Sequence, residues 1–203
     1  MVFSARSRHS SLQQVNKRVA AGVPYQLKKT VVLVGMMGAG KTSVGTALAR
    51  RIDVPFRDSD HALEEAANRT IAEIFTRDGE AFFREKESQV IERLLHSTPC
   101  ILSTGGGAFL SPRNREMIAA RAVAVWLKAD IRLLWSRVRH KDTRPLLRTP
   151  DPFATLTQIA EQREPAYAEA GLVVEADARY SIEDMVQRVI DTLLTRPDVL
   201  ERR

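Results

Sequence analysis

Residues 35–42 read Gly-Met-Met-Gly-Ala-Gly-Lys-Thr and match the pattern G-x-x-x-x-G-K-[S/T] at every fixed position. Glycines there let successive backbone N–H groups turn toward phosphate oxygens, and a following helix adds its positive N-terminal end. Lys41 supplies a mobile cation for the β- and γ-phosphates, and the Thr42 hydroxyl can ligate Mg²⁺. The motif predicts an ATP·Mg²⁺ site with contacts from Gly38, Ala39, Gly40, Lys41, Thr42 and Ser43.

The context of this motif argues against a chance match. An apolar, β-branched run at residues 31–34 precedes it, and residues 42–51 have helical character. A strand before the loop and a helix after it are what the phosphate-binding chemistry needs. Met36 and Met37 are expected to pack the loop and not to contact the ligand.

Two carboxylates follow the next predicted strand, at Asp58 and Asp60. Residues two apart on a strand share a face, and the carboxyl ends of parallel strands form the ligand crevice of an open sheet. Asp58 could hold Mg²⁺ through water, and Asp60 would face an acceptor hydroxyl and take its proton. The alternative is a solvated turn in which an aspartate only caps a helix.

Two arginines are candidates for binding an anionic acceptor. Arg84 follows the apolar residues 81–83, and Arg163 precedes Glu164-Pro165. Guanidinium groups pair bidentately with carboxylates, although a single arginine on a helix is usually a solvated side chain. Gly105-Gly106-Gly107 comes directly after a strand, so that its backbone could approach a ligand closely; an ordinary flexible turn is the alternative.

Residues 141–151 form a charged segment bounded by Pro145 and Pro150. We interpret this segment as a mobile lid that closes over ATP and excludes water, with Arg144 reaching the phosphate in transfer. Arg179 is a weaker candidate for an adenine contact, as are Arg137 and Arg139, which could instead belong to a solvated helix face.

The elements that must position these residues alternate along the chain. Strands are predicted at residues 31–34, 55–60, 100–103, 122–127 and 172–175. Helices are predicted at 42–51, from Thr70, at 79–97, after Ser111-Pro112, at 131–139, at 153–170 with an interruption at Pro165, and from Ser181 to 194. This order predicts one α/β domain with a five-stranded parallel sheet and helices on both faces.

Charge is distributed unevenly along the 203 residues. The formal net charge is +6, and residues 1–29 hold six basic residues and no acid, so that residues 30–203 are balanced. We therefore predict a basic extension at 1–29, disordered or partly helical, a domain at 30–195 and a tail at 196–203. A basic excess confined to the extension argues against a nucleic-acid partner, and no apolar run is long enough to cross a membrane.

The single cysteine, Cys100, lies in an apolar run and can form no internal disulfide. It is interpreted as a buried small hydrophobe, with a nucleophile as the distant alternative. The four histidines show no ligand spacing with one another or with Cys100, so no structural zinc is expected. Trp126 and Trp135 lie in apolar contexts and are predicted core residues.

From about residue 30 to 195 the chain resembles the shikimate kinases. The resemblance rests on the phosphate loop at 35–42, Asp-Ser-Asp at 58–60, Phe-Arg at 83–84, Gly-Gly-Gly at 105–107, Arg-Pro-Leu-Leu at 144–147 and Arg-x-Pro-x-Tyr at 163–167. Thr42 replaces a more usual serine but keeps the hydroxyl. The resemblance implies a P-loop kinase that passes the γ-phosphate of ATP to the 3-hydroxyl of shikimate, with Mg²⁺ as cofactor.

The resemblance also implies the roles of individual residues. It assigns the shikimate carboxylate to Arg84 and Arg163, the 3-hydroxyl to Asp60, an acceptor contact to the Gly106 N–H, and water-mediated Mg²⁺ binding to Asp58. Catalysis would fall to Lys41, Asp60 and Arg144, and ATP binding to the phosphate loop with Arg144 and Arg179. A monomer in a bacterial cytoplasm is expected, or a plastid enzyme if residues 1–29 are a transit peptide.

Two other functions remain possible on the sequence. A related small P-loop kinase would act on gluconate or a nucleoside monophosphate, and the arginine pair favours a carboxylate over a nucleotide. A P-loop ATPase could also act as a switch or assembly factor, and such a protein would hydrolyse ATP equally fast without an acceptor.

Overall fold

The computed structural model describes residues 24–140 and 145–203. Its centre is a five-stranded parallel sheet with the strand order β3-β4-β2-β5-β6. The strands are β2 (Thr30–Val34), β3 (Phe56–Asp58), β4 (Ile101–Ser103), β5 (Ala122–Ala129) and β6 (Leu172–Ala176). The predicted five-stranded α/β architecture is thereby confirmed.

The central strands are buried because helices cover both faces of the sheet. Every residue of β2 and β4 is buried, which explains their continuous apolar sequences. Val31 of β2 is in register with Ile101 of β4 on one side and with Val123 of β5 on the other. The carboxyl ends of these strands therefore lie at one edge of the sheet, where the chain turns into its candidate functional loops.

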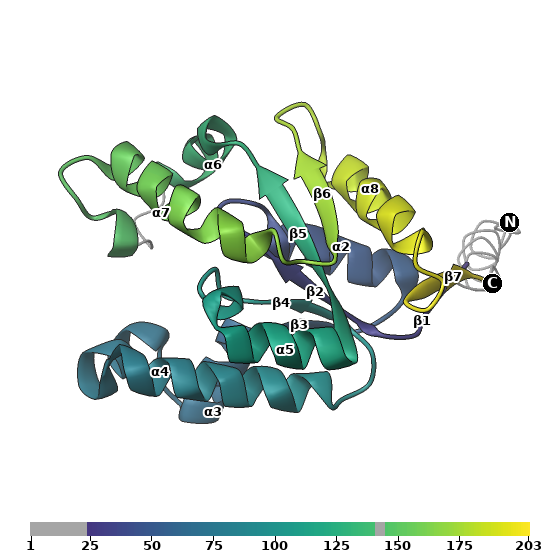
Figure 1. The fold of residues 1–203 in the computed structure, drawn as a ribbon, viewed down its shortest axis with the longest axis horizontal. Coiled ribbons are helices and arrows are strands. Elements are labelled where there is room, and N and C mark those ends of the chain that lie inside the picture. Colours follow the sequence, from purple (N-terminus) through teal and green to yellow (C-terminus); the bar gives the residue numbers. More distant parts are fainter. Residues whose placement is uncertain (1–23, 141–144) are drawn as a thin grey trace, which may run out of the picture.

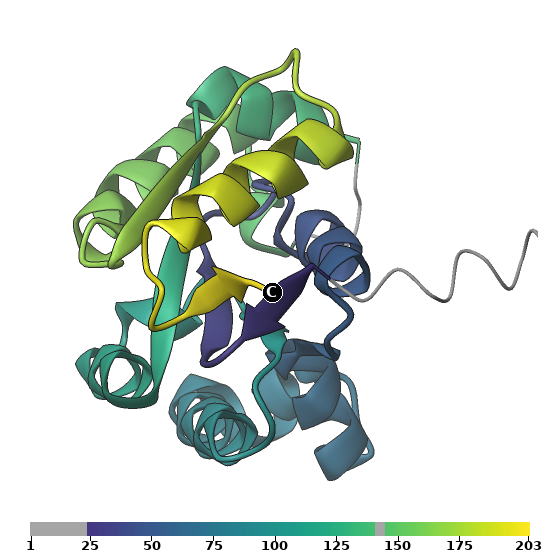
Figure 2. The ribbon, with the colours of Figure 1, turned by 90° about the vertical axis from the view of Figure 1, so that its right-hand side faces the viewer.

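Two pairs of helices enclose the sheet (Figures 1 and 2). The first pair consists of α2 (Lys41–Ile52) and α8 (Ile182–Leu194), and the second of α4 (Ile71–Leu95) and α5 (Pro112–Arg121). The two helices of each pair contact each other. The remaining helices are α3 (Ser59–Ala67), which packs on α4, and the contacting pair α6 (Ile131–Val138) and α7 (Pro152–Tyr167). None of the helices in the described ranges combines the length and apolar character that crossing a bilayer requires.

Side-chain caps begin several helices where the sequence predicts them. Thr70 and Glu73 form a capping box at α4, Ser111 caps α5 ahead of Pro112, and Ser181 caps α8. The predicted division between a helix that begins after Thr70 and one at 79–97 is confirmed, because the backbone of α4 is non-helical at Gly79, where the element kinks. Gly79 has φ 81°, a left-handed value that glycine adopts without a Cβ penalty.

The predicted interruption at Pro165 is wrong, because α7 continues from Pro152 to Tyr167. A proline inside a helix removes one N–H bond and crowds the carbonyl four residues earlier. Pro165 lies in the last turn of α7, so the missing bond affects only the end of the helix. Arg163 and Tyr167 are consequently one turn apart on the same helix.

A second, two-stranded sheet joins the two ends of the described chain. Strand β1 (Tyr25–Leu27) pairs antiparallel with β7 (Leu200–Arg202), and this ribbon lies beside the C-terminus in Figure 1. Lys28 pairs with Glu201 at 2.6 Å and Lys29 with Asp198 at 2.8 Å, both partly exposed and therefore weak. Regular structure thus extends beyond the predicted 30–195 boundaries, into the predicted extension and tail.

The predicted core residues lie inside the molecule. Cys100 is fully buried, Trp126 is buried, and the half-buried Trp135 packs edge-on against Phe153 at 5.6 Å between ring centroids. Met36 and Met37 are also buried, as expected for residues that pack the phosphate loop. Burial raises the pKa of the Cys100 thiol, so that the thiolate needed for nucleophilic chemistry is disfavoured.

Candidate functional site

A cleft of about 420 Å³ opens at the carboxyl ends of the strands. It collects residues from five separate parts of the sequence: the loop after β2, the aspartates at the end of β3 and the start of α3, the loop after β4, Arg137 of α6, and the turn into α8. Its lining includes residues 37–44, Asp58, Asp60, residues 103–106, Arg137, residues 180–182 and Met185. The phosphate loop and both predicted aspartates therefore share one cleft.

The loop between β2 and α2 has the geometry that phosphate binding needs. Gly40 lies in the left-handed region with φ 97° and precedes the first residue of α2, where no side chain caps the helix. The first turn of α2 lines the cleft, where the positive end of the helix can attract an anion. Gly38 has φ 85°, and a Cβ there would lie 2.8 Å from Val138 Cγ1, so that α6 packs directly on the loop.

Two cations contact this loop. The Lys41 ammonium donates hydrogen bonds to the carbonyl oxygens of Gly35 at 2.8 Å and Met36 at 3.1 Å. The Arg137 guanidinium donates to the carbonyl oxygens of Gly38 at 3.2 Å and Ala39 at 3.4 Å, and Arg137 lines the cleft. Arg137, which the sequence ranks among the weaker candidates, therefore lies closer to the nucleotide-binding loop than a solvated helix residue would.

Asp58 caps a helix, the alternative that the sequence left open, and its carboxylate also contacts the phosphate loop. Its Oδ1 accepts hydrogen bonds from the N–H groups of Asp60, at 3.0 Å, and His61, and so caps α3. Its Oδ2 accepts a hydrogen bond from the Thr42 hydroxyl at 3.4 Å. A single carboxylate thereby holds the start of α3 and reaches the phosphate loop.

Asp60 lies in the first turn of α3 and points into the cleft toward residues 105–107, which we call the glycine loop. Burial, together with the nearby Asp58 carboxylate, raises the pKa of its carboxyl group to about 6, although the Lys41 charge opposes the change. A carboxyl group with a pKa near 6 is ionised at pH 7 and still basic enough to accept a proton.

The three glycines after β4 each face a different candidate side chain. A Cβ on Gly105 would lie 2.7 Å from Asp60 Oδ1, one on Gly106 would lie 3.2 Å from Arg163 Nη1, and one on Gly107 would lie 2.7 Å from both terminal nitrogens of Arg84. The glycines thus make room for three functional groups from α3, α7 and α4. The sequence prediction that Asp60, Arg84 and Arg163 share one site is consistent with this geometry.

Glu87 is a residue of this site that the sequence interpretation missed. Its side chain is 2% exposed and accepts a hydrogen bond at 2.8 Å from Arg84 Nη1, whose Nη2 also reaches the exposed Glu80 at 3.2 Å. Burial raises the pKa of the Glu87 carboxyl group, and Arg84 opposes that change. The i, i+3 spacing of Arg84 and Glu87 on one helix was the available signal.

Of the two remaining predicted nucleotide contacts, one lies apart from these groups and the other falls outside the described residues. The Arg179 side chain is 82% exposed and paired with Asp177, and it does not line the cleft, although residues 180–182 do. Arg144 lies outside the described residues, as does the first part of the predicted lid at 141–151. Pro145–Leu147, which follow, form a short 3-10 turn in which Leu147 is buried and Leu146 exposed.

The residues beside the phosphate loop suit a magnesium ion. The Thr42 hydroxyl and the Asp58 carboxylate are hard oxygen donors that already lie within 3.4 Å of each other. Mg²⁺ in nucleotide sites binds one or two protein oxygens, with phosphates and waters completing its shell. Among the described residues no group of three or more His, Cys, Asp and Glu side chains forms a dedicated metal cage, which this mode of binding does not require.

The chain is similar to known proteins along most of its length. The family model for shikimate kinase matches residues 37–194. A shikimate kinase of Cereibacter sphaeroides is 62% identical over 92% of this chain and 93% of its own length, and one of Ruegeria pomeroyi is 60% identical over 97% and 98%. The solved structure of the Acinetobacter baumannii shikimate kinase in complex with shikimate is 34% identical, with a TM-score of 0.78 over 82% of this chain and 93% of that one.

The five-stranded sheet, the phosphate loop and the adjoining polar site define the protein as a small P-loop kinase, a nucleotide-binding transferase. Within that class, the matching family model and these relatives show that the chain belongs to the shikimate kinase family.

Proposed function

We propose that this enzyme transfers the γ-phosphate of ATP to the 3-hydroxyl of shikimate and releases ADP and shikimate 3-phosphate. The observation that carries the proposal is the convergence of Asp60, Arg84 and Arg163 on the glycines 105–107. Shikimate bears one carboxylate and three hydroxyls, and two guanidinium groups with one carboxylate match that pattern of charge. The solved Acinetobacter relative, which is a complex with shikimate, supports the same acceptor.

The nucleotide would bind across the phosphate loop. The N–H groups of residues 38–43 would surround its phosphates, and Lys41 would exchange its present carbonyl contacts for β- and γ-phosphate oxygens. Thr42, together with Asp58 through water, would hold Mg²⁺, which supplies charge neutralisation of the phosphates when bound. Arg137 would add positive charge where the loop meets α6.

On the acceptor side, Arg84 and Arg163 would hold the carboxylate, and the Gly106 N–H would contact the bound acid. Asp60 would orient the 3-hydroxyl and take its proton as the hydroxyl oxygen bonds to the γ-phosphorus. The bond from that phosphorus to the β–γ bridging oxygen breaks, and ADP leaves with the electron pair. The pairing of Arg84 with Glu87 would fix the guanidinium group before the acid arrives.

The lid prediction belongs to this proposal as well. Residues 141–151 would close over the bound nucleotide, and Arg144 would stabilise the charge that spreads over the equatorial oxygens of the transferring group. Closure would exclude water, which otherwise competes with the alcohol for the phosphoryl group. Arg179 remains a proposed adenine contact, which would require it to leave Asp177.

A coupled assay of ADP release tests the proposed acceptor. Purified protein is supplied with ATP and Mg²⁺, and the rate of ADP release is measured with shikimate, with gluconate, with AMP and without an acceptor. We expect rapid ADP release with shikimate and little with the other acceptors or with none. Equal ATP turnover without an acceptor would support the switch or assembly-factor alternative and overturn the proposal.

The pKa of Asp60 predicts the acid limb of the pH profile. Because the raised pKa lies at about 6, the carboxylate that accepts the proton is present above that pH and lost below it. We expect kcat/KM for shikimate at saturating ATP to fall about tenfold per pH unit below pH 6. A profile measured from pH 5 to 8.5 that stays flat down to pH 5 would exclude Asp60 as the base.

We further propose that the enzyme acts as a monomer in a bacterial cytoplasm. The curated relatives described above are bacterial proteins, which favours this location over a plastid. Nucleic acid and membrane are not expected partners, because the charge of residues 30–203 is balanced.

A further inference from the structure

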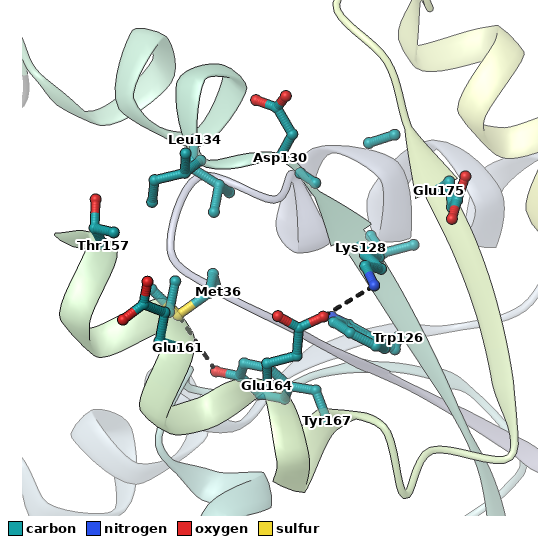
Figure 3. A pocket seen from close by; sticks show the side chains of 15 residues that line it. Met36, Trp126, Lys128, Asp130, Leu134, Thr157, Glu161, Glu164, Tyr167 and Glu175 are labelled. Atoms are coloured by element: carbon teal, nitrogen blue, oxygen red, sulfur yellow. Dashed lines mark hydrogen bonds and ion pairs between the residues drawn. The ribbon is translucent and has the colours of Figure 1, made fainter.

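Tyr167 is a buried polar residue at the edge of the acceptor site to which the proposed mechanism gives no task. It is the last residue of α7, its side chain is 1% exposed, and its ring packs against Trp126 with 6.0 Å between centroids. Figure 3 shows Tyr167 beside Met36 in the cavity of about 380 Å³ that β5, α6 and α7 border. A buried hydroxyl is costly to maintain unless it is hydrogen-bonded, so its partners indicate its role.

The Tyr167 hydroxyl bonds to the middle glycine of the glycine loop. It donates to the Gly106 carbonyl oxygen at 2.6 Å and also lies 3.9 Å from Met36 Sδ. A phenol has one proton to donate, so the short bond to Gly106 takes it and the sulfur is a packing contact. One side chain therefore contacts both the glycine loop and the phosphate loop.

The carbonyl groups of the three glycines accept hydrogen bonds from different donors. The Gly105 carbonyl accepts from Ala108 N–H and the Gly107 carbonyl from Leu110 N–H, both at 3.1 Å, within the turn that follows. The Gly106 carbonyl instead accepts its hydrogen bond from the distant Tyr167 hydroxyl. Three successive glycines have the greatest backbone freedom, so the central peptide needs an external anchor to keep one orientation.

Arg163 lies beside the same anchor. It precedes Tyr167 by one helical turn, and a Cβ on Gly106 would lie 3.2 Å from Arg163 Nη1 and 3.7 Å from the Tyr167 oxygen. The Arg163 guanidinium group also opposes the rise in the pKa of the Tyr167 hydroxyl that burial causes. The hydroxyl thus sits between the carboxylate-binding arginine and the glycine whose N–H faces the acceptor.

We propose that Tyr167 is a positioning residue for the acceptor: its hydroxyl fixes the Gly106 carbonyl, and with it the backbone of the glycine loop beside Arg163, in the orientation that receives shikimate. This inference rests on the proposed function. In this proposal Tyr167 contacts neither the reacting atoms nor the nucleotide. Removing its hydroxyl should therefore weaken acceptor binding selectively.

The test is Tyr167→Phe, which keeps the buried ring and removes only the hydroxyl. Because one hydrogen bond is lost, we expect KM for shikimate to rise about five- to tenfold. KM for ATP should change less than about twofold. Tyr25→Phe removes a hydroxyl from β1, away from the cleft, and serves as the matched control with unchanged constants. An unchanged KM for shikimate, or an equal rise in both KM values, would overturn the inference.

Amide hydrogen exchange of residues 105–107 gives a readout that needs no acceptor. We expect exchange there to accelerate about fivefold or more in Tyr167→Phe, with the core amides of β2 unchanged. Unchanged exchange at the glycine loop would show that Tyr167 does not anchor it and would also overturn the inference. Wild-type protein that fails to phosphorylate shikimate would instead defeat the proposed function, whatever the exchange rates are.

Discussion

Replacing Asp60 by Asn should lower kcat for shikimate phosphorylation by about 10²- to 10⁴-fold, the range that a positioned general base contributes. The amide keeps the size of the side chain in the space that Gly105 provides, but it cannot accept the hydroxyl proton. No phosphate contact is removed, so KM for ATP should change little. Steady-state kinetics with each substrate varied separately measures both effects.

The same substitution should stabilise the fold at high pH. A carboxyl group whose pKa is raised to about 6 in the folded protein, from 3.8 in a free chain, contributes stability below pH 3.8 and loses it as pH rises through 6. Asn carries no charge at any pH, so Asp60→Asn should raise the free energy of unfolding at pH 8 and leave it nearly unchanged at pH 4. Denaturant unfolding at the two pH values checks this sign.

Asp191→Asn is the matched control, because Asp191 is an exposed carboxylate on α8 that bonds to Gln187 away from the cleft. It should change neither kcat nor the pH dependence of stability. If Asp60→Asn retained wild-type kcat, Asp60 would have no part in proton transfer. If it lost activity and stability together at pH 8, a structural defect would explain the loss better than a missing base.

The features that the sequence predicts well are local ones. The phosphate loop depends on eight consecutive residues, and the caps at Thr70, Ser111 and Ser181 depend on side chains within three residues of the N–H groups they serve. The buried strands follow equally from short apolar runs. In each case the interacting groups are neighbours in the chain, so a short sequence pattern is enough to predict the interaction.

The features that the sequence did not predict depend on residues far apart. Pairing of β1 with β7 joins residues near 26 to residues near 201, and neither segment has a distinctive pattern of its own. The bond from Tyr167 to Gly106 spans 61 positions, and its importance appears only when α7 is seen against the glycine loop. The glycines 105–107 suggested a close approach, but only the fold shows which three side chains approach them.

Removing the Arg84 side chain is the second change with a large expected effect, because it alters both the acceptor site and the fold. Arg84→Ala should raise KM for shikimate by about 100-fold, since a paired charge that binds the carboxylate is lost. It also leaves Glu87, which is 2% exposed, without its partner. Breaking a buried pair from one side is costly, and we expect about 2 kcal/mol of destabilisation at pH 8, discounted because Arg84 is partly exposed.

The destabilisation should depend on pH in a definite direction. Burial already raises the pKa of Glu87, and without Arg84 the carboxyl group loses the opposing charge, so its pKa rises further. Glu87 would then be protonated and neutral at low pH, and Arg84→Ala should cost less stability at pH 5 than at pH 8. Glu80→Gln is the control, because Glu80 is the exposed partner of Arg84, at 67% exposure, and should contribute little.

A double variant separates the two roles of Arg84. In Arg84→Ala/Glu87→Gln the uncompensated buried charge is gone, so most of the stability lost at pH 8 should return, whereas KM for shikimate should remain high because the guanidinium group is still missing. Failure to recover stability would show that Glu87 does not cause the loss. Recovery of the shikimate KM together with stability would mean that Arg84 supports the fold and does not bind the acceptor.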